Sequence, residues 1–113
     1  MAMTDTTSLP VFDSAHLAQY TSGDPDLGRE LAGLLRDQAT RSIAAMQAAG
    51  DMAAWQAAAH TLKGAARGMG AFALGGACER AEAATQANWP AALADVRASA
   101  VEALAAIDAA LSS

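Results

Sequence analysis

The sequence is poor in aromatic residues, cysteine and lysine, and each shortage narrows the range of proteins it can encode. Only 4% of the 113 residues are aromatic, although 53% are hydrophobic. A core must therefore be built mainly from Ala, Leu, Val, Ile and Met, which suit the close packing of helices. A chain of this length buries roughly two thirds of its unfolded surface, enough for one modest core. We therefore expect an all-α fold.

The lack of disulfide partners and of long apolar runs bears on location. A single cysteine, Cys78, cannot form an internal disulfide. The opening stretch MAMTDTTSLP has neither the basic start nor the apolar run of a secretory signal. Charged or polar residues interrupt every apolar stretch well before 18 residues, which excludes a membrane-spanning helix. We expect a cytoplasmic protein with no membrane partner, in which residues 1–10 form a flexible leader.

Positive charge is scarce as well. The net charge is −5, and the seven basic residues include only one lysine, with the arginines scattered along the chain. Without a basic stripe to neutralise phosphates, nucleic acid is not an expected partner. No Gly-Lys-Ser/Thr loop is present, and GMG at 68–70 is followed by AFA rather than by a third glycine. We therefore expect no autonomous ATP-dependent kinase activity.

Capping residues and helix breakers divide the chain into five predicted helices. Asp13, Asp24 and Asp51 each stand where a carboxylate can cap the first N–H groups of a helix. Gly68 and Gly70 bracket a tight corner between the third helix and the fourth. The predicted helices cover residues 14–20, 25–49 and 52 to about 68, a fourth that ends near Asn88, and a fifth that starts at Trp89 and Pro90.

Apolar residues recur every three or four positions along the long helices, as expected for helices that face a common core. Four long helices joined by short corners predict an antiparallel four-helix bundle, with the short first helix lying over one end. We assign residues 11–113 to this single bundle domain. The predicted stripe of the second helix comprises Leu27, Leu31, Leu34, Leu35, Ala39, Ile43 and Met46.

The third helix carries the chain's only lysine, Lys63, three residues after His60. At 100° per residue, Leu62 and Ala66 lie on the side opposite His60, so the apolar side faces the core and His60 points outward. Gly64 lies beside the imidazole on the exposed face. The other residues near this face, which we expect to bind a partner, are Ala53, Gln56, Ala57, Arg67 and Gly68.

The combination of His60, Lys63 and Gly64 suits a reaction with a phosphoryl group. A neutral imidazole is a good nucleophile toward a phosphoryl group, and the product carries new negative charge. Lys63, one helical turn from His60, can neutralise that charge. Gly64 leaves the imidazole unobstructed, although a glycine inside a helix costs about 1 kcal/mol relative to alanine. We infer that the active site of a partner must approach His60 closely.

The segment AHTLKGAARGMGA at 59–71 resembles the signature of the histidine-containing phosphotransfer domain, which is His, two residues, Lys-Gly and then a Gly-Ala corner. The resemblance begins at VFDSAHLAQYTSGDPDLGRELAGLL and extends through the five-helix order to the C-terminal helix. It implies that His60 is phosphorylated, that Lys63 and Gly64 support it, and that Glu82 on the next helix hydrogen-bonds the ring. Many members have Ser where this chain has Ala65.

The resemblance also implies a role in a two-component phosphorelay. The chain would accept a phosphoryl group on His60 from a receiver domain or from a hybrid or conventional histidine kinase, and pass it to the receiver of a response regulator. Since the His60 face has no acidic cluster for a metal, we expect the chain to have no cofactor of its own and Mg²⁺ to be held by the partner receiver. We expect a monomer.

Two other classes of protein stay open. The chain could be a docking or inhibitory module for a signalling kinase that works without phosphorylation. A haem- or metal-binding bundle needs an inward histidine with further inward ligands, and the outward placement of His60 argues against it.

Several residues also have an ordinary structural interpretation. Glu82 could belong to a solvated face, His16 is expected to be a surface residue rather than a second phosphorylation site, and Cys78 is expected to fill the core. Gly75 and Gly76 weaken the fourth helix, and close helix packing or partner access could each explain them.

Overall fold

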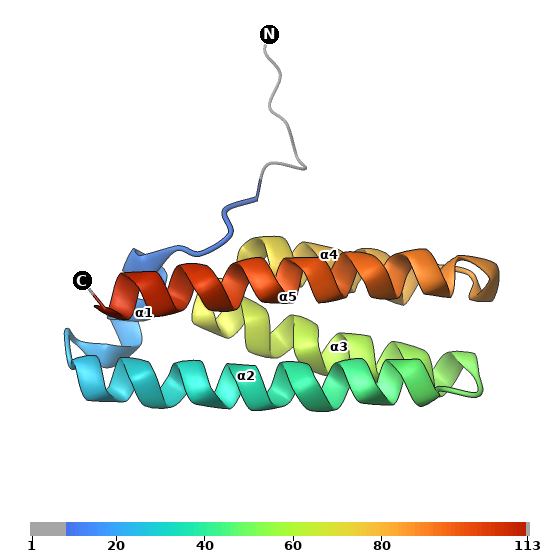
Figure 1. The fold of residues 1–113 in the computed structure, drawn as a ribbon, viewed down its shortest axis with the longest axis horizontal. Coiled ribbons are helices and arrows are strands. Elements are labelled where there is room, and N and C mark those ends of the chain that lie inside the picture. Colours follow the sequence, from blue (N-terminus) through green and yellow to red (C-terminus); the bar gives the residue numbers. More distant parts are fainter. Residues whose placement is uncertain (1–8, 113) are drawn as a thin grey trace, which may run out of the picture.

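The computed structural model describes residues 9–112, which fold into five α-helices and one 3-10 turn. The four long helices form a ring in which α2 and α4 each pack against both α3 and α5, while α1 lies at one end of the bundle (Figure 1). The predicted all-α bundle is therefore confirmed. The elements are α1 (Ser14–Thr21), α2 (Pro25–Ala48), α3 (Met52–Met69), α4 (Phe72–Ala83), η1 (Gln86–Asn88) and α5 (Trp89–Ser112).

The helix starts follow the predicted caps. The carboxylate of Asp13 accepts hydrogen bonds at the start of α1, that of Asp24 at the start of α2, and that of Asp51 at the start of α3. Gly70 ends α3 with φ at 86°, and a Cβ there would lie 2.7 Å from the Asp13 carbonyl oxygen. The Asp13 amide donates to the Gly70 carbonyl at 2.9 Å, which fastens the start of α1 to the corner between α3 and α4.

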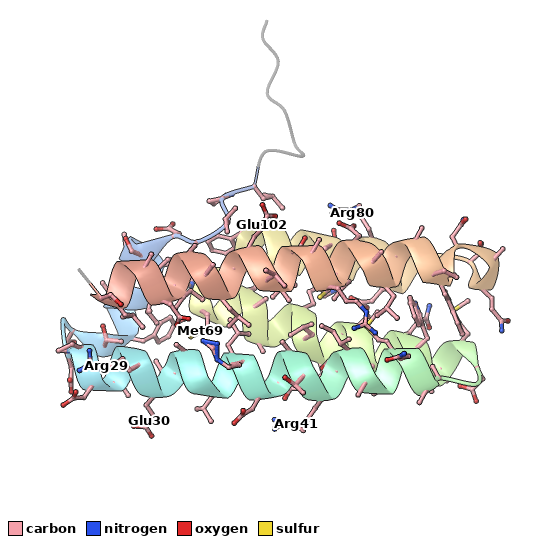
Figure 2. The ribbon with its side chains drawn as sticks, in the orientation of Figure 1. Arg29, Glu30, Arg41, Met69, Arg80 and Glu102 are labelled. Atoms are coloured by element: carbon pink, nitrogen blue, oxygen red, sulfur yellow. The ribbon has the colours of Figure 1, made fainter. Side chains whose placement is uncertain are left out.

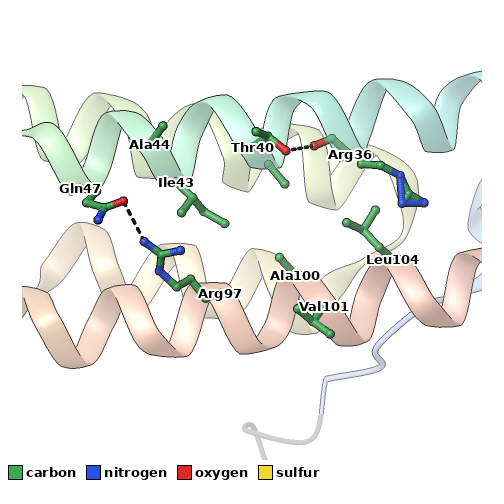
Figure 3. Close-up of a pocket in the computed structure, with 10 residues that line it drawn as sticks. Arg36, Thr40, Ile43, Ala44, Gln47, Arg97, Ala100, Val101 and Leu104 are labelled. Atoms are coloured by element: carbon green, nitrogen blue, oxygen red, sulfur yellow. Dashed lines mark hydrogen bonds between the residues drawn. The ribbon is translucent and has the colours of Figure 1, made fainter.

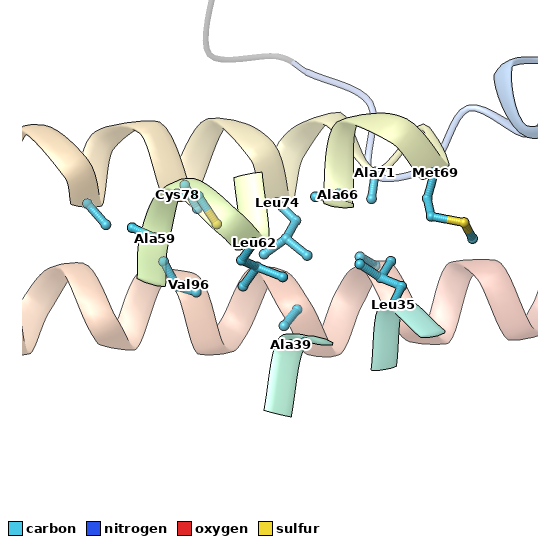
Figure 4. Close-up of a cluster of buried hydrophobic side chains, with 14 of the residues drawn as sticks. Leu35, Ala39, Ala59, Leu62, Ala66, Met69, Ala71, Leu74, Cys78 and Val96 are labelled. Carbon is cyan, nitrogen blue, oxygen red and sulfur yellow. The ribbon is translucent and has the colours of Figure 1, made fainter. Parts of the chain in front are cut away.

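The core is built from small and aliphatic side chains, with one aromatic pair near the turn into α5. Trp55 and Trp89 stack with ring centroids 4.5 Å apart and planes 7° from parallel. Cys78 is fully buried, as predicted. Charged side chains such as Glu30 and Arg41 extend from the outer side of α2 (Figure 2). Figure 4 shows core residues from all four long helices: Leu35, Ala39, Ala59, Leu62, Ala66, Met69, Leu74, Cys78 and Val96.

The fourth helix is shorter than predicted. It ends at Ala83 rather than near Asn88, because Ala84 takes an extended backbone conformation with φ at −71° and ψ at 141°. A 3-10 turn then leads into α5. This turn brings Trp89 to the position where it stacks on Trp55, a long-range contact that local helix propensity does not reveal.

Two further expectations are wrong. Leu34 does not belong to the core stripe of α2 and is 59% exposed, because it lies beside the groove between α1, α2 and α3. His16 is half-buried rather than on the surface, because its ring packs edge-on against Tyr20 and Phe72 at centroid distances of 5.7 and 5.2 Å. Within residues 9–112 its buried Nε2 has no hydrogen-bond partner.

The predicted leader falls mostly outside the described residues, which begin at Leu9. The Pro10 carbonyl accepts a hydrogen bond from the Ala73 amide at 2.9 Å, so the chain is fastened to the start of α4. Leu9 covers Gly76, where an added Cβ would lie 2.8 Å from the leucine Cδ1. In the part of the chain that the structure describes, no helix combines the length and apolar character needed to cross a membrane.

Candidate functional site

His60 projects from the exposed face of α3, as the helical wheel predicted. Its side chain is 71% exposed, and its Nδ1 lies 3.3 Å from Oε2 of Glu82 on α4. The other ring nitrogen, Nε2, pairs with nothing among residues 9–112. The ring is therefore held from one side and open on the other.

Glu82 joins His60 to the only lysine. Its second oxygen, Oε1, lies 2.6 Å from Lys63 Nζ, so one carboxylate contacts both an imidazole and an ammonium group. Burial alone raises the pKa of Glu82, but the hydrogen bonds and charges of Lys63 and then His60 outweigh burial and lower the pKa below its ordinary value of 4.5. Glu82 is therefore an anion at neutral pH and can accept a hydrogen bond from a protonated Nδ1, which leaves the Nε2 lone pair free.

Lys63 is less exposed than the helical wheel predicted. Its side chain is only 17% exposed because it extends sideways to Glu82 rather than outward beside the imidazole. In this arrangement the ammonium group stabilises the charge of Glu82. To contact a phosphoryl group on Nε2 of His60, the lysine side chain would have to rotate away from this ion pair.

Two more polar contacts join α3 to α4 on either side of this cluster. Gln56 Nε2 donates to the backbone carbonyl of Glu82 at 3.1 Å. Arg67 pairs with Glu79 at 3.0 Å, and its aliphatic stem lies across Gly75, where an added Cβ would be 2.8 Å from the arginine Cγ. Gly75 is thus packed against Arg67 within the chain, whereas the atom nearest an added Cβ at Gly76 is the movable end of the Leu9 side chain.

Small residues continue the exposed face of α3 toward α2. Gly64 and Gly68 follow His60 at successive turns, and a Cβ added at either glycine would meet nothing within 4 Å. Ala53 and Ala57 are also exposed. Of the residues predicted to bind a partner, Ala53, Gln56, Ala57 and Gly68 are thus exposed, whereas Arg67 is engaged with Glu79.

The row of small residues leads to an apolar groove that the sequence did not reveal. The groove lies between α1, α2 and α3 and has a volume of about 640 Å³. Tyr20 and Leu34, each 59% exposed, line it. The signal for it was the apolar stripe of α2, which is wider than the core requires. The groove is also lined by the apolar side chains of Leu27, Leu31, Leu35 and Met69.

Among residues 9–112, no group of three or more His, Cys, Asp or Glu side chains is arranged to hold a metal ion. A model of the family described as the Hpt domain matches residues 26–112. The matched segment spans nearly all of α2 to α5 and includes His60, Lys63, Gly64 and Glu82. Comparisons with curated proteins and with solved structures gave no significant match.

Proposed function

The chain belongs to the Hpt domain family, whose role is phosphotransfer in phosphorelays, and on this basis we propose that His60 is its phosphoryl-accepting residue. The contact of 3.3 Å between Glu82 and Nδ1 carries the proposal, because it occupies one ring nitrogen and leaves the other exposed. His16, the other histidine, is half-buried and its Nε2 is covered. Of the two histidines, only His60 has an accessible ring nitrogen in the part of the chain that the structure describes.

The proposed reaction uses the Nε2 lone pair of His60. This nitrogen attacks the phosphorus of a phospho-aspartate in a receiver domain, so that the P–N bond forms as the acyl P–O bond breaks and the aspartate leaves as a carboxylate. The Nδ1 proton stays hydrogen-bonded to Glu82, whose negative charge stabilises the positive charge that develops on the ring. The reverse reaction delivers the phosphoryl group to the aspartate of a second receiver.

The remaining catalytic groups come from the partner. Phosphoryl transfer depends on positioning and on neutralising charge, chiefly with a metal ion, and we assign Mg²⁺ to the receiver. The receiver covers His60 and extends along Gly64 and Gly68 toward the apolar groove, which Gly68 lines together with Tyr20 and Leu34. Ala53, Ala57 and Arg67 complete the docking surface.

The test is transfer from a receiver carrying ³²P on its aspartate. The wild-type protein should gain a label that is lost in acid and kept in base, as expected for phosphohistidine, and His60→Gln should gain none. Because the His60 side chain is exposed, the variant should keep the helical circular dichroism of the wild type. His16→Gln is the matched control and should still be labelled.

A label that persists in His60→Gln would refute the assignment of His60. If the wild type bound the receiver or a histidine kinase but gained no label under conditions in which the receiver stays phosphorylated, the alternative function would be favoured. The chain would then be a docking or inhibitory module that works without phosphorylation.

A further inference from the structure

We propose that Gln56 is a positioning residue for phosphotransfer, which acts by holding the last turn of α4 so that Glu82 stays in contact with His60. This inference rests on the proposed function of His60. It assigns to Gln56 a role within the chain that is separate from any contact with a partner.

The end of α4 has carbonyl groups that the helix itself cannot satisfy. The last four carbonyls of an α-helix have no amide donor one turn ahead, and α4 ends at Ala83. The Ala81 carbonyl accepts from the Trp55 indole at 2.7 Å and from the Ala84 amide at 3.1 Å. The next carbonyl, that of Glu82, accepts from the Gln56 side chain at 3.1 Å. Two adjacent residues of α3 therefore cap α4.

Gln56 completes a three-point attachment of Glu82 to α3. Gln56, His60 and Lys63 stand at i, i+4 and i+7, so they lie on one face of α3. The first binds the backbone carbonyl of Glu82, and the other two bind its carboxylate oxygens. The backbone contact fixes the point from which the carboxylate must extend.

This attachment matters because α4 is weakly stabilised by its own sequence. The helix has only 12 residues, contains Gly75 and Gly76, and its N-cap residue, Ala71, provides no side-chain hydrogen bond. A glycine inside a helix is less favourable than an alanine. The position of the last turn of α4 therefore depends on contacts with neighbouring helices.

The geometry at His60 is sensitive to small movements of that turn. The distance of 3.3 Å from Nδ1 to Glu82 is already at the long end for a hydrogen bond. If the Glu82 carbonyl were released to water, fraying of the last turn would lengthen this contact. The preference for a proton on Nδ1 would weaken, and Nε2 would be a poorer nucleophile.

Replacing Gln56 tests how the last turn of α4 positions Glu82 with less disturbance of the fold than replacing Trp55. Trp55 is buried in the core and stacks on Trp89, so replacing it would disturb the fold. Gln56 is exposed, and Gln56→Ala removes the hydrogen bond without opening a cavity. Gln56→Glu keeps the shape of the side chain but cannot donate when ionised.

The matched control is Gln47→Ala. Gln47 also makes a hydrogen bond between helices, accepting from Arg97 at 2.9 Å across α2 and α5 (Figure 3). The substitution removes the same side chain from an exposed helix position and breaks one interhelical bond. It lies in the groove between α2 and α5 and touches no residue of the His60 cluster.

The experiment combines ¹⁵N NMR of the free protein with transfer kinetics. In Gln56→Ala and Gln56→Glu, the ¹⁵N shifts of His60 should show a smaller fraction of the tautomer protonated on Nδ1. Transfer from a phosphorylated receiver should slow about threefold to tenfold, less than the roughly 10- to 100-fold typical of losing a direct partner of a metal-bound histidine. Gln47→Ala should match the wild type in both measurements.

The Kd for an unphosphorylated receiver separates positioning from docking. A Kd within about twofold of the wild type, together with slower transfer and a changed tautomer, supports the positioning role. An unchanged tautomer in Gln56→Ala overturns the role, whether or not transfer is slower. A wild type that accepts no phosphate at His60 overturns the proposed function instead, and the tautomer measurement distinguishes the two failures because it needs no partner.

Discussion

Gly64 lies inside α3 on the face that carries His60, and a Cβ added there would meet nothing within 4 Å. Glycine is about 0.8–1.0 kcal/mol less favourable than alanine in a helix, and glutamine ranks only slightly below alanine. Gly64→Gln should therefore raise the free energy of unfolding by about 0.5 kcal/mol. For a domain of this size the gain corresponds to a rise in Tm of about 2–4 °C, which thermal denaturation followed by circular dichroism can resolve.

Transfer should change in the opposite direction. Side chains four residues apart in a helix have Cβ atoms about 5–6 Å apart, so a glutamine at position 64 would stand beside the His60 imidazole, where the receiver must enter. A displacement of about 1 Å in a reacting pair can cost roughly 100-fold in rate. We expect transfer from a phosphorylated receiver, followed by rapid quench, to slow by about tenfold or more.

Gly33→Gln provides the control. Gly33 is also an exposed glycine inside a long helix with nothing within 4 Å of an added Cβ, but it lines a separate pocket with Arg36 and Asp108. The variant should gain the same stability and transfer at the wild-type rate. Wild-type transfer in Gly64→Gln would refute the idea that this glycine is kept to give a partner access.

Three further predictions concern the charge cluster and the core. Although burial opposes it, contacts with Lys63 and His60 keep the pKa of Glu82 below 4.5. The difference in free energy of unfolding between the wild type and Glu82→Gln, measured with urea, should therefore be complete above pH 4.5. It should shrink as the pH falls through the lower pKa of the folded protein. Burial, followed by the charge of Glu82, raises the pKa of Cys78 to about 12, so iodoacetamide at pH 8 should alkylate it only in the unfolded protein. Leu62 is fully buried, so Leu62→Ala should lower the free energy of unfolding by about 2–5 kcal/mol. His60 is exposed, so His60→Gln should change it by less than about 0.5 kcal/mol. Urea denaturation measures both changes.

The features that the sequence predicted best depend on local chemistry. Asp13, Asp24 and Asp51 cap helices through amides two or three residues away, so their role is visible in a short window of sequence. The outward direction of His60 follows from the helical period alone. The contact between Glu82 and Nδ1 was predicted from the family resemblance, and the spacing of the two residues around the Gly70 corner is compatible with it.

The features that the sequence missed depend on contacts between distant segments. The end of α4 at Ala83 is tied to the stacking of Trp55 and Trp89, which no local signal marks. The helical wheel gave the direction of Lys63 but could not show that its flexible side chain extends to Glu82. The exposed position of Leu34 results from how α1 and α3 pack beside α2, and periodicity within one helix does not determine that arrangement.

The most direct test of the central claim is to locate the phosphate by NMR after transfer from a phosphorylated receiver. In ¹⁵N-labelled protein, the ³¹P and ¹⁵N signals identify the bonded nitrogen. We predict one phosphoryl group on Nε2 of His60, with the proton on Nδ1 facing Glu82. A phosphoryl group on Nδ1 of His60, on His16 or on any other residue would contradict the account.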